Sequence, residues 1–160
     1  MDETRFWQMI EDAWASTGGW SDERKALAAG QLPDDQLTEL ADALDQVIPA
    51  LRDRLQELNQ NDLLAFDRIL ERKLWEIDRA EIQEHTDGSD DGFLYARGFI
   101  VAAGRDYYNA VNATPERAQM DVECEDICYL SFHVYSEKFG KMPKSDLSRE
   151  SGSNQSGWSQ

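Results

Sequence analysis

The sequence has only two cysteines and no long hydrophobic run. Cys124 and Cys128 are four residues apart, a spacing that places both on one face of a helix but does not suit a relaxed disulfide. We therefore expect reduced, partly buried thiols. No apolar run approaches the length that spans a bilayer, and the N-terminus lacks the basic and apolar regions of a signal peptide. These absences predict a cytoplasmic protein with no membrane partner.

Basic residues are also scarce. The chain has 32 aspartates and glutamates but only 16 lysines and arginines, which gives a formal net charge of −16. A nucleic-acid-binding protein needs cations to release counterions from phosphates, so we expect no direct DNA or RNA binding. Two interpretations of the charge remain open: it keeps the protein soluble, or it attracts a partner that is itself a basic protein.

Motifs for metals, cofactors and nucleophilic catalysis are missing as well. Cys124, Cys128 and His133 would not present three ligands on one helix face, so we predict no metal site. The chain has no phosphate-binding glycine loop, no dinucleotide fingerprint and no nucleophile elbow with a Ser-His-Asp set. The sequence therefore indicates no cofactor and no catalytic residue, and it favours a non-enzymatic role without excluding an enzyme.

Apolar residues recur at helical spacing along most of the chain. The composition is 41% hydrophobic, which suffices for one folded core in a chain of this length. We predict an all-α fold, a single-domain helical bundle of about five to seven helices within residues 1–140. Residues 141–160 are rich in serine and glycine, and we expect a disordered tail there. The predicted helices cover residues 3–14, 21–30, 34–58, 63–82, 93–107 and 121–139.

A leucine-rich seam runs through the third predicted helix, with spacings of three and four residues that approach a heptad pattern. Pro49 interrupts the seam, and we expect a kink or a break near Val47 and Ile48 because proline removes a helical hydrogen bond. The seam either packs inside the bundle, which we favour, or forms a homo-oligomer. Its members are Leu37, Leu40, Leu44, Ile48, Leu51, Leu55 and Leu58.

The same segment is unusually acidic and forms our first candidate site. No lysine or arginine lies between Lys25 and Arg52, so the outer face of the helix should be anionic. Acids are also concentrated in residues 121–126. A face of this kind suits a basic protein partner. The candidate partner surface consists of Asp34, Asp35, Glu39, Asp42 and Asp45.

The loop before the fifth predicted helix resembles half of a calcium-binding loop. Asp87, Ser89 and Asp91 supply oxygens at its first, third and fifth positions, and Gly92 is the sixth residue. Gly98 stands at the twelfth position, where such loops need a bidentate carboxylate. We therefore favour a helix N-terminus, with Ser89 or an aspartate as its N-cap.

This loop and the helix after it form the second candidate site. Acid–base catalysis and ligand binding both use carboxylates placed near an arginine and a phenol. The competing interpretation is structural, because Arg97 lies among small and apolar residues and would be partly buried and paired with an acid. The candidate ligand or partner residues are Ser89, Asp90, Asp91, Tyr95 and Arg97.

One segment resembles the signature of an uncharacterised bacterial family, the domain of unknown function numbered 4240: Ser89-Asp90-Asp91-Gly92-Phe93-Leu94-Tyr95-Ala96-Arg97-Gly98-Phe99-Ile100, followed by Gly104-Arg105. Two further stretches also resemble parts of that family, namely Phe6-Trp7-x-x-Ile10 and the helix from Ala65-Phe66-Asp67 to Leu74-Trp75. The resemblance covers residues 3–135. It implies a helical fold and a bacterial cytosolic setting, but it carries no established activity and transfers no catalytic residue.

These observations leave three hypotheses of function. The leading one is a non-enzymatic protein-interaction module, of an immunity, inhibitor or regulatory kind, whose acidic surface binds a basic partner. The alternative is a small enzyme or ligand sensor with a pocket around residues 89–97. The third is a helical domain that self-associates through the leucine-rich seam of residues 37–58.

Overall fold

The computed structural model describes residues 1–86 and 88–159, and the regular structure in these two ranges is entirely helical. The all-α prediction is confirmed, but the ten α-helices of the described residues exceed the expected five to seven. Within those ranges, none of the helices is both long and apolar enough to cross a membrane. The helices are α1 (Glu3–Ala15), α2 (Ser21–Ala28), α3 (Asp34–Gln56), α4 (Gln60–Glu76), α5 (Ala80–Gln83), α6 (Asp90–Ala102), α7 (Arg105–Ala113), α8 (Glu125–Cys128), α9 (Leu130–Phe139) and α10 (Gln155–Trp158), with a 3-10 turn at Pro115–Arg117.

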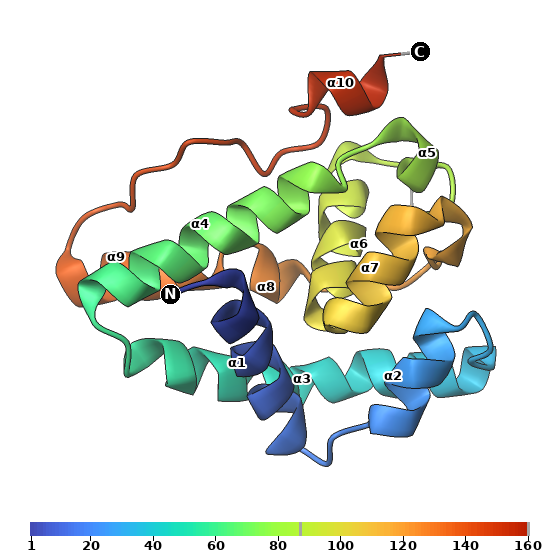
Figure 1. The fold of residues 1–160 in the computed structure, drawn as a ribbon, viewed down its shortest axis with the longest axis horizontal. Coiled ribbons are helices and arrows are strands. Elements are labelled where there is room, and N and C mark those ends of the chain that lie inside the picture. Colours follow the sequence, from blue (N-terminus) through green and yellow to red (C-terminus); the bar gives the residue numbers. More distant parts are fainter. Residues whose placement is uncertain (87, 160) are drawn as a thin grey trace.

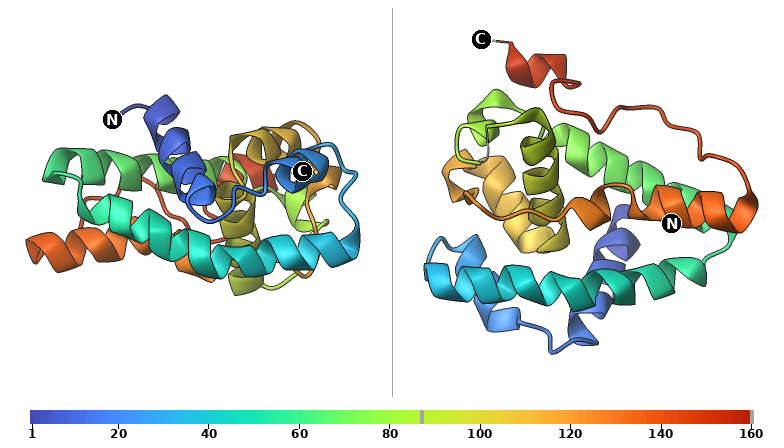
Figure 2. Two further views of the ribbon diagram at one scale, coloured as in Figure 1. Left: turned by 90° about the horizontal axis from the view of Figure 1, so that it is seen from below. Right: turned by 180° about the vertical axis from the view of Figure 1, so that it is seen from behind.

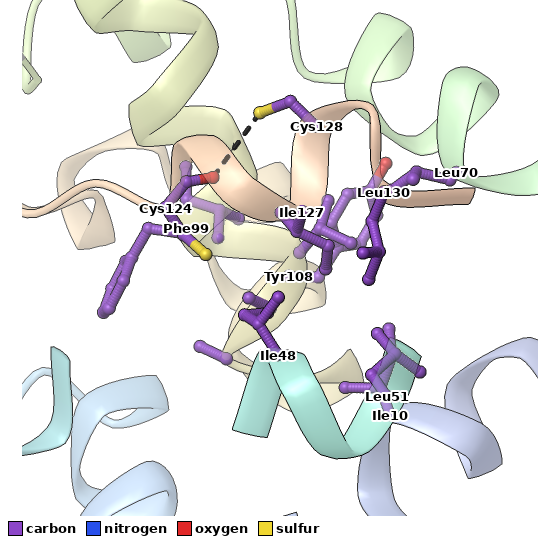
Figure 3. Packing of buried hydrophobic residues seen from close by; sticks show 14 of the residues in the cluster. Ile10, Ile48, Leu51, Leu70, Phe99, Tyr108, Cys124, Ile127, Cys128 and Leu130 are labelled. Atoms are coloured by element: carbon purple, nitrogen blue, oxygen red, sulfur yellow. Dashed lines mark hydrogen bonds between the residues drawn. The ribbon is translucent and has the colours of Figure 1, made fainter. Parts of the chain in front are cut away.

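Two long helices, α3 and α4, frame the molecule, and α1 crosses between them (Figure 1). Helices α6 and α7 stand at one end, where α7 also packs against α2. The buried apolar side chains form one core, and Trp14 is anchored in it by donating its indole N–H to the carbonyl of Ala102 at 2.7 Å. Figure 3 shows side chains of α1, α3 and α8 in this core, among them Ile10, Leu51 and Ile127.

Three predicted helices are interrupted and the C-terminal segment adds α10, which together account for the higher count. The breaks lie at residues 77–79, at Gly104 and at Tyr129. Gly104 has a φ of +110°, a conformation that glycine adopts easily and other residues rarely do. Asp78 is fully buried, and its carboxylate accepts hydrogen bonds from the C-terminal segment. Apolar residues keep helical spacing across the breaks, so periodicity alone predicted continuous helices over residues 63–82, 93–107 and 121–139.

Helix α3 continues through Pro49, so of the kink or break that the sequence predicted near Val47 and Ile48, the break does not occur. Proline leaves the carbonyl of Asp45 without its helical donor, but both residues are exposed, so water can reach that side of the helix. The leucine-rich seam is buried within the chain, with side chains only 0–8% exposed. It packs inside the bundle, and α3 contacts both α1 and α9.

The C-terminal segment, residues 141–159, is not the disordered tail that the sequence predicted. It runs along α4 as an extended chain and ends in α10 (Figures 1 and 2). Pro143, Arg149 and Asn154 are buried. The expectation of disorder rested on the few apolar residues of this segment, whereas hydrogen bonds to charged side chains of the preceding helices hold it in place. We refer to residues 141–159 as the tail and to residues 1–140 as the body.

Helices α6 and α8 pack closely at Gly98, and this contact can be tested. A Cβ atom at Gly98 would lie 2.3 Å from the carbonyl oxygen of Cys124 and 2.7 Å from Cys128 Sγ. We expect Gly98→Ala to lower the free energy of unfolding by about 1–3 kcal/mol in urea denaturation, because the two helices must move apart. Gly88→Ala is the control, since a Cβ there meets nothing within 4 Å. Equal stability of the two variants would contradict this packing.

Candidate functional site

The predicted loop site is an ordinary helix N-terminus. The Ser89 hydroxyl accepts a hydrogen bond from the backbone N–H of Gly92 at 2.9 Å, so Ser89 is the N-cap of α6, as the sequence favoured. Asp90 and Asp91 are exposed in the first turn, where negative charge favours the positive end of the helix dipole. Asp87, the first position of the half-built calcium loop, lies outside the described residues.

The other two residues of this candidate site point to different neighbours. The backbone of Tyr95 faces the start of α8, where its carbonyl accepts from the N–H of Cys124 at 2.9 Å. Partial desolvation and the nearby Glu125 carboxylate raise the pKa of the Tyr95 phenol. Arg97, by contrast, bonds to the tail. The five predicted residues therefore do not converge on one pocket.

Arg97 is a fully buried cation in α6. Its Nη1 donates to the carbonyl of Leu74 at 2.8 Å, and its Nη2 donates to the carbonyl of Arg149 at 2.9 Å and to the hydroxyl of Ser151 at 3.1 Å. Burial lowers the pKa of Arg97, and the nearby Asp78 carboxylate opposes this effect. The arginine is buried and bonded, as the structural interpretation expected, but its hydrogen-bond partners are carbonyls and a hydroxyl.

Three buried carboxylates that the sequence did not reveal face the tail. Asp67 and Glu71 are one helical turn apart on α4, and Asp78 follows seven residues later. Their exposed fractions are 0%, 1% and 0%. Together with Arg97 they form the buried charge cluster. The i, i+4 spacing of Asp67 and Glu71 is the only sequence signal for this cluster, and such spacing is more common on solvated helix faces.

The tail supplies a cation to Asp67. Arg149 is 4% exposed, and its Nη2 lies 2.6 Å from Asp67 Oδ1. The same carboxylate oxygen accepts from the hydroxyl of Ser131 at 2.7 Å. Arg149 also donates through Nη1 to the carbonyl of Cys128 at 2.8 Å, and its guanidinium stacks 5.1 Å from the ring centre of Tyr129. One tail side chain thus bridges α4 and α8.

The tail supplies mostly backbone donors to the other two carboxylates. Glu71 accepts from the N–H groups of Asp146 and Leu147 and from the Ser145 hydroxyl at 2.5 Å. Asp78 accepts three hydrogen bonds, from Gly152 N at 3.0 Å, Asn154 N at 2.9 Å and Trp158 Nε1 at 2.9 Å. All three buried carboxylates are therefore satisfied in part by the tail.

The first candidate site, on α3, is an exposed anionic surface. Asp34, Asp35, Glu39, Asp42 and Asp45 are all exposed, and none of them forms an ion pair with another described residue. This arrangement leaves their charge available to a partner.

The fold adds acids from distant segments to this surface. A groove of about 530 Å³ lies beside the start of α3, and among the described residues no lysine or arginine lines it. Asp34 shares its lining with Glu84, Glu116 and Asp121, and Met120 is 60% exposed there. These carboxylates come from three separate stretches of the chain, at the start of α3, at residue 84 and at residues 116–121.

A second groove, of about 440 Å³, lies midway along α3. Its apolar lining residues are Ile48, Pro49 and Leu130, and its polar ones are Asp45 on α3, Asp126 on α8, Arg52 and His133. The acidic segments 34–45 and 121–126 therefore meet along one side of the molecule. We call α3 from Asp34 to Asp45, with the two grooves, the acidic face.

The cysteines belong to the core. Cys124 and Cys128 are both free and buried, and Cys128 Sγ donates to the carbonyl of Cys124 at 3.5 Å (Figure 3). Burial raises the pKa of each thiol to about 12. His133 is exposed on α9. Within residues 1–86 and 88–159, no group of three His, Cys, Asp or Glu side chains is placed to hold a metal ion.

The chain belongs to the DUF4240 family, described as proteins of unknown function, whose family model matches residues 1–137. This match confirms the resemblance found in the sequence. Comparison with curated proteins gives no match, and neither does comparison with solved structures. The matched span contains the buried charge cluster and the acidic face, whereas the tail lies beyond it.

The ion pair between Arg149 and Asp67 gives a direct test of how the tail is held. We expect Arg149→Ala to lower the free energy of unfolding by about 3 kcal/mol, because charge-assisted bonds are lost and a buried carboxylate loses its cation. Urea denaturation measures the loss, and the double variant with Asp67→Asn should lose less than the sum of the single variants.

Arg52→Ala is the control for this pair. Arg52 is paired with Glu137, but the two side chains are 34% and 56% exposed, so this substitution should cost less than about 1 kcal/mol. Additive effects of Asp67→Asn and Arg149→Ala would contradict the direct coupling between tail and body.

Proposed function

We propose that this member of the DUF4240 family is a non-enzymatic interaction protein whose acidic face binds a basic protein. The observation that carries the proposal is the gathering of unpaired carboxylates from three stretches of the chain along one side of α3. Solubility depends on the total charge and does not require acids to be concentrated at one place. The clustering of Glu84, Glu116 and Asp121 beside α3 therefore supports a role in binding.

The charges and the grooves have complementary roles in this proposal. Unpaired carboxylates steer a cationic partner toward the face and select against anionic ones. Apolar side chains supply contact area from which water is excluded. Met120 is 60% exposed in the first groove, and Pro49 is exposed in the second. The partner segment that fits best carries lysines or arginines interspersed with apolar side chains.

The alternative of a small enzyme or ligand sensor around residues 89–97 has less support. Ser89 caps a helix, Tyr95 faces α8 and Arg97 is bonded within the fold. The two grooves of the acidic face are lined by none of these residues. The tail residue Ser151 bridges Arg97 and the carbonyl of Asp90, so the Arg97 guanidinium is already engaged within the fold.

Neutralising the acidic face tests the proposal. A tagged chain carrying D34N, D35N, E39Q, D42N and D45N is compared with the wild type in affinity capture from its own cells, at low and at moderate salt. We expect the wild type to retain a basic protein at low salt and to lose it when salt screens the charges. The variant with all five substitutions should retain about tenfold less of this protein than the wild type does.

A matched variant separates a specific face from net charge. It neutralises five exposed acids elsewhere: Asp12, Asp22, Asp53, Glu57 and Asp106. Both variants change the net charge equally, so only the location differs. The proposal is contradicted if both variants lose the basic protein to the same extent, or if both recover as much of it as the wild type does.

A further inference from the structure

The surface of the body that the tail covers, here called the tail groove, has the chemistry of a polypeptide-binding site. We propose that it binds an arginine-bearing segment of a partner protein, and that residues 145–158 are a tethered occupant which such a segment displaces. The groove is the tail-facing side of α4 together with α6 and α8, and the buried charge cluster lies along it. Figure 1 and the right-hand view of Figure 2 show the tail on the opposite side of α4 from α3. Binding in this groove therefore does not depend on the acidic face.

The groove recognises main-chain groups at several points. Glu71 accepts two consecutive backbone N–H groups, and Asp78 accepts two more that are separated by one residue. Arg97 donates to a tail carbonyl in between. Any extended polypeptide offers such donors and acceptors, so the charge cluster can bind segments of varied sequence. The preference for a cation is local, because the Arg149 guanidinium lies 2.6 Å from Asp67 and 3.7 Å from Glu71. The body arginines Arg68 and Arg79 lie beside other parts of the tail, at Asp146 and Gly157.

Two side-chain contacts add selectivity. The Arg149 guanidinium lies between the Asp67 carboxylate, the carbonyl of Cys128 and the face of Tyr129. A planar fork of donors over an aromatic ring fits arginine better than lysine. Nine residues later, the ring of Trp158 meets the edge of Phe93 with 5.9 Å between ring centres. A ligand should therefore carry an arginine and, further along, an aromatic side chain.

The tail leaves part of the groove unsatisfied. Asp67 Oδ2 accepts no hydrogen bond from a described residue, and Arg97 Nε donates none, although both residues are fully buried. Unpaired buried polar atoms cost free energy. An arginine that bonded both oxygens of Asp67 would gain one contact over the tail. A partner segment can thus fit the groove better than the tail does.

The attachment of the tail is compatible with displacement. The tail follows Gly140, whose φ is +66°, and Lys141 and Met142 are exposed. Among the described residues, the buried side chains of the apolar core all precede the tail, and the tail adds the buried Pro143 and the partly buried Trp158, which packs against that core. The tail is held mainly by polar contacts, which water can replace when it leaves. The body keeps its apolar core without it.

Cutting the connection in the full chain tests displacement. A protease site is inserted between Lys141 and Met142, and the probe is a labelled synthetic peptide of residues 144–159. The uncut chain should take up the peptide poorly, because the tethered tail competes at an effective concentration on the order of millimolar. After cutting, the chain should bind the added peptide with a Kd at least about tenfold lower than that of the uncut chain. Its helical circular dichroism should not change.

Two variant peptides control for specificity. A peptide with Arg149→Lys keeps the charge but loses the fork, so it should bind about tenfold more weakly. A peptide with Lys144→Ala alters an exposed residue and should bind like the parent. Loss of helical signal on cutting would overturn the proposal by making the tail part of the folded core. The proposal is also overturned if the cut chain stays folded but takes up no peptide, or if it binds the Arg149→Lys peptide equally well.

Discussion

A carboxylate that leaves water needs hydrogen-bond donors, and this requirement organises one side of the molecule. Helix α4 presents its apolar side to the core and places Asp67 and Glu71 along the edge of that side, facing the tail, with Asp78 just beyond its end. Body residues alone supply few donors there, and the tail provides the rest through Arg149 and main-chain N–H groups. The same hydrogen bonds therefore hold the tail in place and satisfy the buried carboxylates.

The excess of negative charge therefore has two distinct placements. On α3 the acids are exposed and unpaired, and the fold adds Glu84, Glu116 and Asp121 to them. Along α4 the acids are buried and bonded to an arginine and to amides. The first arrangement attracts a cationic surface from a distance, and the second holds an extended segment by direct contact. Both fit a protein whose role is to bind other polypeptides.

Local features of the fold could be predicted from the sequence, because they depend on neighbouring residues. Local sequence patterns predicted the amphipathic helix α1, the N-cap at Ser89 and the end of α9 at Gly140. Features that depend on distant partners were not. Arg149 and Asp67 are 82 residues apart, and nothing near either residue indicates the pairing. The contiguous acids of α3 were predictable as a candidate surface, whereas the acids that the fold brings beside them were not.

Native-state hydrogen exchange of the tail amides tests whether buried carboxylates hold the tail in place. The informative amides are those of Leu147, Gly152 and Asn154, which donate to Glu71 and Asp78. We expect them to exchange more slowly than in a free peptide of the same sequence, and faster than the amides of α4, because the tail opens locally. Exchange at the free-peptide rate, with α4 still protected, would contradict a tail held by these carboxylates.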